Sequence, residues 1–185
     1  MATKHQDIGP YQLPWENQLN QIRRDRSQAR SSTCFCCVPV SSSNTINGQT
    51  KDNVSIKPTQ AQLESWRTDF KNVMKDDKGR QLFSRYLKEE YSEENLEFWL
   101  EVEAFKRMTE DAANLNGKAT CIYTTFVKQM SEREVNISGK TRKQIGVAIQ
   151  EENVKNDTFS DAQSQVYSLM HRQSYPRFIL SNLFK

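Results

Sequence analysis

Residues 86–105, YLKEEYSEENLEFWLEVEAF, place seven acidic residues around leucines and aromatic residues that recur at helical spacing. Ser92 is a favourable N-cap, and Glu94 stands in the first turn that would follow, where the helix dipole favours an acid. Neither role explains Asn95, a mediocre helix former, or Tyr91, which precedes the helix. The stretch is therefore either the polar start of a buried helix or a surface made for a partner.

The aromatic residues locate the folded part of the chain. Of its 9 Phe, 3 Trp and 6 Tyr residues, only Tyr11, Trp15 and Phe35 precede residue 58. A length of 185 residues suffices for one domain with a core and a tail, and an apolar content of 36% is low for a compact chain. We therefore expect a disordered tail over residues 1–57 and one folded domain over residues 58–185.

Several classes of function are disfavoured. The 26 basic and 23 acidic residues nearly balance, whereas nucleic-acid-binding domains concentrate basic charge. The sequence has no P-loop, GxGxxG or HExxH motif and no arrangement typical of a Ser/His/Asp triad, so we do not expect an enzyme or a cofactor. No apolar run reaches the roughly 18 residues of a membrane span, and the N-terminus does not resemble a signal peptide. These observations favour a cytosolic protein.

From Pro58 onward the sequence predicts helices with caps and shows no convincing strand pattern. We predict an all-α domain of roughly seven to nine helices. The segment 118–130 should form one of them, with Ile122, Phe126 and Met130 on its apolar stripe. The predicted boundary signals are capping boxes at Thr59 with Gln62 and at Ser160 with Gln163, a cap at Thr141, a break at Lys78–Gly79, and Pro176 in the first turn of the last helix.

Three of the four cysteines, Cys34, Cys36 and Cys37, form a cluster, and Cys121 stands alone. A structural zinc site needs four ligands, commonly in C-x-x-C pairs, so this spacing does not favour a metal. The cluster follows the arginine-rich segment RRDRSQAR, and acyl chains next to basic residues supply the two signals that stable membrane anchoring requires. We predict acylation at these three positions; free thiols in a tail remain the alternative. Cys121 is predicted to be a small buried residue.

Three separated motifs resemble the RGS family, the regulators of G-protein signalling. They are YLKEEYSEENLEFWLEVEAFK, EVNI and FSDAQSQVYSLMHRQSYPRF, and the resemblance covers about residues 60–185. The cysteine cluster, together with LMHRQSYPRF, is similar to the RZ subfamily, whose members carry a cysteine string. Here that string is short, with three cysteines.

The resemblance implies a fold of nine helices that binds the α subunit of a heterotrimeric G protein, with the Gi/Gz class expected, and accelerates its GTP hydrolysis. Such a domain is not itself an enzyme, because the α subunit carries its own Arg and Gln for the reaction. The domain would instead bind the mobile switch segments in their transition-state arrangement. It would act as a monomer at the cytoplasmic face of membranes and in the cytosol. The alternative is a scaffold that binds another signalling partner without activating GTP hydrolysis.

The family's partner contacts match positions in all three motifs. Without the resemblance, Leu169 would be interpreted as a core residue, Arg177 as a solvated arginine and Asn136 as a turn residue. At residue 173 the family usually has Asp, and the Gln here predicts weakened or redirected selectivity. The implied contact residues are Tyr91, Ser92, Glu94, Asn95, Asn136, Leu169, Gln173, Ser174 and Arg177.

Overall fold

The computed structural model describes residues 58–108 and 112–184, which contain helices and no strand, so the all-α prediction is confirmed there. The predicted tail over residues 1–57 lies outside this part. The α-helices are α2 (Gln60–Thr68), α3 (Phe70–Lys75), α4 (Asp77–Glu89), α5 (Glu94–Lys106), α6 (Ala112–Ile122), α7 (Gly139–Gln150), α8 (Ser160–Leu169) and α9 (Tyr175–Phe178). Two π-helical turns, Tyr123–Val127 and Met170–Ser174, extend α6 and α8, and a 3-10 turn covers Asn182–Phe184.

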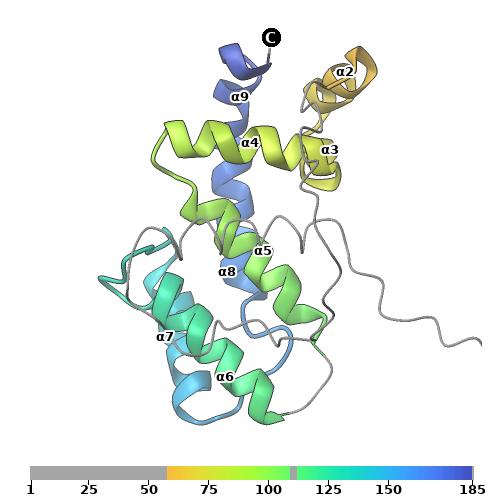
Figure 1. Cartoon of the computed structure of the whole chain (residues 1–185). Helices are drawn as coiled ribbons and strands as arrows, with labels where there is room; N and C mark the ends of the chain where they lie inside the picture. Colours follow the sequence, from red (N-terminus) through yellow and green to blue (C-terminus); the bar gives the residue numbers. More distant parts are fainter. Residues whose placement is uncertain (1–57, 109–111, 185) are drawn as a thin grey trace, which may run out of the picture. The chain divides into compact units, whose positions relative to one another are not determined.

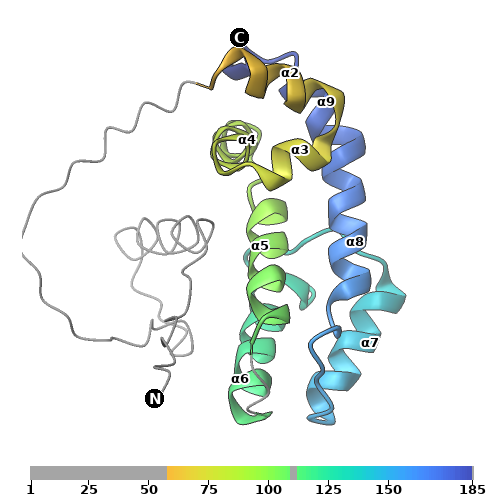
Figure 2. The same ribbon diagram turned by 90° about the vertical axis from the view of Figure 1, so that its right-hand side faces the viewer.

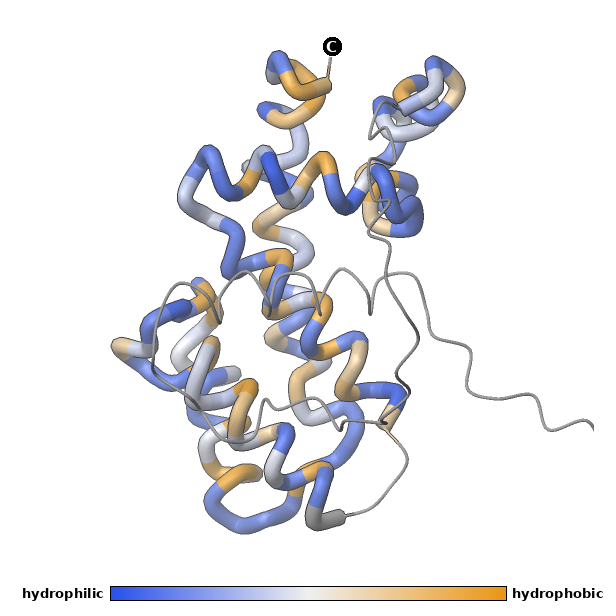
Figure 3. The backbone as a smooth tube through the Cα atoms, viewed as in Figure 1, coloured by the Kyte–Doolittle hydropathy of each residue, from blue (hydrophilic) through white to orange (hydrophobic). Residues whose placement is uncertain are grey.

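Helices α5 and α8 lie side by side, with α6 next to α5 and α7 next to α8 (Figure 1). Helix α4 crosses one end of this pair and is seen end-on in Figure 2, where α5 and α8 run vertically. Helix α5 is therefore covered from several directions, and its buried apolar residues do not form a single stripe: Leu96, Phe98, Leu100, Val102 and Phe105. Figure 3 shows hydrophobic positions along every helix of the bundle.

An aromatic cluster joins the first helices to the last ones. The ring of Phe70 lies between 5.1 and 5.7 Å, centroid to centroid, from the rings of Phe83, Tyr167, His171 and Tyr175. The buried Tyr175 hydroxyl donates to the Trp66 carbonyl over 2.7 Å, which satisfies a polar atom that would otherwise be costly to bury. Segments far apart in the sequence are thus held together at the end of the bundle where α4 lies.

Of the helix caps predicted at Thr59, Thr141 and Ser92, only the one at Thr59 is confirmed. The capping box at Thr59 is confirmed: Gln62 N donates to Thr59 Oγ1 over 3.3 Å, and Thr59 N donates to Gln62 Oε1 over 3.0 Å. The predicted cap at Thr141 is wrong, because Ser138 Oγ accepts from Thr141 N over 3.2 Å and Thr141 is buried inside α7. The predicted N-cap at Ser92 is also wrong: its hydroxyl faces back to the Leu87 carbonyl, 3.5 Å away, and α5 begins without a side-chain cap.

The capping box predicted at Ser160 with Gln163 is also wrong, because Gln163 makes a contact between two helices. Ser160 already lies within α8, and Gln163 is buried against α5 instead of turning back to its own helix. Gln163 Nε2 donates to the Trp99 carbonyl over 3.1 Å and to Glu103 Oε1 over 2.8 Å. Its Oε1 accepts from Lys106 Nζ over 2.5 Å. This amide therefore joins α8 to α5.

The break expected at Lys78–Gly79 lies earlier, at Asp76, which ends α3 and caps α4. Asp76 Oδ1 accepts from Lys78 N over 2.9 Å and from Gly79 N over 3.4 Å. Gly79 lies inside α4, where a Cβ would stand 2.7 Å from the Val73 carbonyl oxygen. The glycine is needed for the close approach of α3 and α4, and it does not end a helix.

Candidate functional site

The three stretches implicated by the sequence lie in separate connections of the bundle. The first, residues 91–95, covers the end of the α4–α5 connection and the first two residues of α5; the second surrounds Asn136, before α7; the third runs from the end of α8 into α9. Contacts between their neighbours bring the stretches together on one part of the surface. These contacts are made by Arg133, Gln165 and Glu90, which are not among the contact residues predicted from the sequence.

The first stretch is a tight turn with an exposed tyrosine. Tyr91 has φ of 52°, in the left-handed region that disfavours residues with a Cβ, and is 90% exposed. The turn is held by the amide of Ser92, which donates to the Leu87 carbonyl over 2.9 Å. Strained, well-held residues of this kind are found preferentially at functional sites. Tyr91 is thus presented to solvent from a fixed backbone.

Asn95 does not face outward as expected of a contact residue. It is 7% exposed, and its Nδ2 donates to the Ser92 carbonyl over 3.1 Å and to Glu94 Oε1 over 3.0 Å. Burial raises the pKa of the Glu94 carboxyl, with Glu93 adding to the shift, while its own backbone hydrogen bond and Arg133 oppose it. Asn95 therefore positions Glu94 and the turn, and Glu94 is the side chain of this pair that can meet a partner.

Arg133 ties the first stretch to the second. Its Nη2 lies 2.6 Å from Glu97 Oε2 and 3.8 Å from Glu93 Oε1, and all three side chains are largely buried or half-buried. Glu97 lies in α5 and Glu93 just before it, so Arg133 connects the loop before α7 to the start of α5. Partly buried ion pairs of this kind are screened less by salt than exposed ones. In the sequence, Arg133 is one charge in SEREVNI, and nothing there distinguishes it from a solvated arginine.

The second and third stretches meet at a hollow of about 460 Å³ between the loop before α7 and helix α8. Asn136 is exposed at its edge, and Leu169 is half-buried in its lining, so Leu169 is not simply a core residue. Gln165 connects the two walls: its Oε1 accepts from Ser138 N over 2.7 Å, and its Nε2 donates to Thr141 Oγ1 over 2.7 Å. The hollow offers an apolar side chain and polar groups to a protruding residue of a partner.

The third stretch contains the π-helical turn Met170–Ser174, a local change of winding that is frequent at functional sites. Gln173 is exposed, whereas Ser174 is mostly buried. Arg177 Nε donates to the main-chain oxygen of Gln173 over 3.1 Å, and its Nη1 lies 3.0 Å from Glu90 Oε2. The carboxylate that pairs with Arg177 therefore comes from the end of α4, and this contact joins the third stretch to the first.

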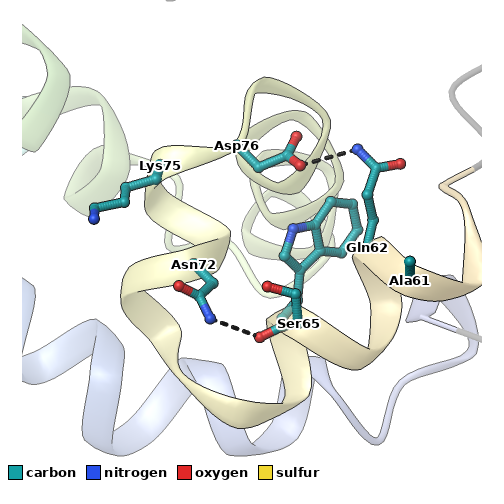
Figure 4. Close-up of a pocket in the computed structure, with 7 residues that line it drawn as sticks. Ala61, Gln62, Ser65, Asn72, Lys75 and Asp76 are labelled. Atoms are coloured by element: carbon teal, nitrogen blue, oxygen red, sulfur yellow. Dashed lines mark hydrogen bonds between the residues drawn. The ribbon is translucent and has the colours of Figure 1, made fainter.

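A second hollow, of about 420 Å³, lies between α2 and α3 (Figure 4). None of the contact residues predicted from the sequence lines it. Its polar groups bond to one another: Gln62 Nε2 donates to Asp76 Oδ2 over 2.9 Å, and Asn72 Nδ2 donates to the Ser65 carbonyl over 2.9 Å. These bonds join the two helices, so we assign the hollow a structural origin.

Of the four cysteines, only Cys121 lies among the described residues. Cys121 is buried and not disulfide-bonded, as predicted, whereas Cys34, Cys36 and Cys37 lie outside the described residues. Among residues 58–108 and 112–184, no cluster of three or more His, Cys, Asp or Glu side chains could hold a metal ion. Within the same ranges, no helix combines the length and the apolar character needed to cross a membrane.

Comparison with known proteins gives consistent matches. A model of the family described as "Regulator of G protein signaling domain" matches residues 69–185. Regulator of G-protein signaling rgs-2 of Caenorhabditis elegans is 38% identical over 128 residues, 69% of this chain and 74% of that protein. Regulator of G-protein signaling 19 of Rattus norvegicus is 39% identical over 132 residues, 71% of this chain and 60% of that protein. Regulator of G-protein signaling rgs-7 of Caenorhabditis elegans is 39% identical over 130 residues, which are 70% of this chain but 16% of that protein.

Proposed function

Because this chain belongs to the regulator of G-protein signalling family, we propose that it accelerates GTP hydrolysis by the α subunit of a heterotrimeric G protein, of the Gi/Gz class. The observation that carries the proposal is the joining of the three separated stretches into one surface. Glu90, Arg133 and Gln165 make the joining contacts. The relatives are named as regulators of G-protein signalling, which indicates a G-protein partner, and the surface supplies a place for that partner to bind.

In this mechanism the chain contributes binding and no reacting group. The α subunit supplies an Arg that stabilises the transition-state charge and a Gln that orients the attacking water. The domain stabilises the switch segments in the arrangement that the transition state requires, so its binding energy favours the transition state over the ground state. Exposed Asn136 can donate and accept hydrogen bonds beside the catalytic Gln, and Glu94 can accept them from a switch segment.

Rigidity of the surface is what makes this binding effective. Donors and acceptors that are already in place do not have to reorganise during the reaction. The turn bearing Tyr91 is held by backbone hydrogen bonds, and the loop bearing Asn136 is held by Gln165. Arg177 is more exposed, and its contacts are with the Gln173 carbonyl and the Glu90 carboxylate. A scaffold with no role in GTP hydrolysis would not need donors and acceptors fixed in this way. Gln173, where the family usually has Asp, is the one feature that favours the scaffold.

Single-turnover GTP hydrolysis tests the proposal. The full chain is added at substoichiometric concentration to a panel of purified α subunits, with Asn136→Ala as the matched variant. We expect acceleration of at least one α subunit, and loss of that acceleration in the variant with its helical content unchanged. If no α subunit is accelerated by the folded wild-type chain, the scaffold function replaces the proposal.

We further propose an RZ-like membrane anchor in the tail, made of acylated Cys34, Cys36 and Cys37 behind a basic segment. Support comes from the sequence alone, since one acyl chain binds membranes only marginally and a second signal makes the attachment stable. Replacing the three cysteines by Ser should move the protein from the membrane fraction to the cytosol and abolish labelling by an alkyne fatty acid. GTP hydrolysis in solution should stay unchanged, because these residues lie far in sequence from the site. Unchanged membrane partitioning of the triple variant would rule out this anchor.

A further inference from the structure

We propose that Met130 is a further contact residue for the α subunit, presenting an apolar side chain to an apolar patch on that partner; this inference rests on the proposed function. The predicted place of Met130 on the apolar stripe of residues 118–130 is wrong, because the helical structure ends at Val127. Met130 is instead 90% exposed, on the connection to α7. Among the described residues, only Tyr91 of the large apolar side chains is as exposed.

The backbone at Met130 is unusual in the same way as that of Tyr91. Its φ of 62° lies in the left-handed region, which glycine occupies without penalty and a residue with a Cβ does not. This chain has Met, a residue with a Cβ, at this position instead of glycine. A residue kept in a disfavoured conformation is evidence for a function of its side chain, provided that the surrounding structure holds it there.

The surrounding loop does hold Met130 in place. Its amide donates to Glu134 Oε2 over 2.8 Å, and Glu134 Oε1 lies 2.7 Å from Arg142 Nη2. Arg142 also donates to the Val127 carbonyl, and the amide of Val135 donates to the Phe126 carbonyl over 2.9 Å, closing the base of the loop. Met130 therefore projects from a braced turn.

The position of this turn links it to the proposed partner surface. Arg133, three residues after Met130, pairs with Glu93 and Glu97 beside the turn of Tyr91, and Asn136 follows in the same loop. In Figure 1 the loop after α6 and the connection between α4 and α5 lie on the same side of the bundle. The two most exposed apolar side chains thus stand on two loops that are joined by an ion pair. The unbranched, polarisable Met side chain adapts well to an apolar surface.

Two substitutions distinguish the effect of the Met130 side chain from that of the backbone conformation at this residue. Met130→Asn removes the apolar side chain, and Asn tolerates positive φ, so the loop should keep its conformation. Met130→Leu keeps an apolar side chain of similar volume. The matched control, Val147→Ala, shortens another exposed apolar side chain, which is 42% exposed on α7, about 12 Å along the axis from the first residue of that helix.

The measurement is the affinity of the full chain for an α subunit loaded with GDP and aluminium fluoride, which mimics the transferring phosphate. We expect Met130→Asn to weaken binding by roughly five- to tenfold, and Met130→Leu and Val147→Ala to stay within about twofold of wild type. Because the contact is apolar, the loss should not shrink as ionic strength rises. Wild-type affinity in Met130→Asn would overturn the inference while leaving the proposed function intact. A wild-type chain that binds no α subunit would remove the proposed function itself.

Discussion

Replacing Asn95 by Ala tests the conclusion that this residue braces the turn from inside. The substitution removes two hydrogen bonds from Nδ2, to the Ser92 carbonyl and to the Glu94 carboxylate. Each bond contributes about 0.5–1.5 kcal/mol, and the better helix propensity of Ala returns up to about 0.7 kcal/mol. We therefore expect a loss of about 1–2 kcal/mol in the free energy of unfolding, or roughly 3–8 °C in Tm for a domain of this size.

The matched variant is Asn136→Ala, because the family resemblance implied that both amides contact the partner. Asn136 is exposed, so its truncation should change the free energy of unfolding by less than about 0.5 kcal/mol while GTPase activation is lost. Urea unfolding of both variants, followed by circular dichroism, measures the difference, and single-turnover hydrolysis measures activation. An Asn95→Ala variant as stable as wild type would refute the assignment of Asn95 as a structural brace.

Three further substitutions, one of them with a matched control, test the roles of Glu94, Gln173 and Gly79. Burial raises the pKa of Glu94, so its contribution to stability is full below the ordinary glutamate pKa of about 4.3 and is lost as pH rises through the raised value. The stability of Glu94→Gln relative to wild type should therefore increase from acidic to neutral pH in urea titrations. Gln173→Asp should tighten binding of the activated α subunit about fivefold by supplying a charged acceptor; weaker binding would make Gln173 a selectivity residue. Gly79→Ala should lower the free energy of unfolding by about 1–3 kcal/mol, because its Cβ would meet the Val73 carbonyl, whereas Gly117→Ala, with nothing within 4 Å, should raise it; urea titrations measure both.

The joining contacts of the candidate site were not predictable from the sequence, although its parts were. The motifs containing Tyr91, Asn136 and Arg177 were found because they are short and contiguous. Glu90 and Arg133 were missed because a charged residue on a polar stretch is usually solvated, and only its partner reveals another role. The burial of Asn95, which is 7% exposed, was not predicted because helical spacing of apolar residues does not determine where a polar side chain points.

The sequence by itself determined the helical class, because hydrophobic spacing and caps such as the Thr59–Gln62 box act within one turn of the chain. It also located the folded domain, since all but three of the aromatic residues follow residue 57. The tertiary structure alone decided the partners of the buried polar groups. Gln163 could have capped its own helix, and it bonds to α5 instead because the packing of α8 on α5 buries it there. A buried polar atom needs a hydrogen-bond partner, and the partner nearest in space is often remote in sequence.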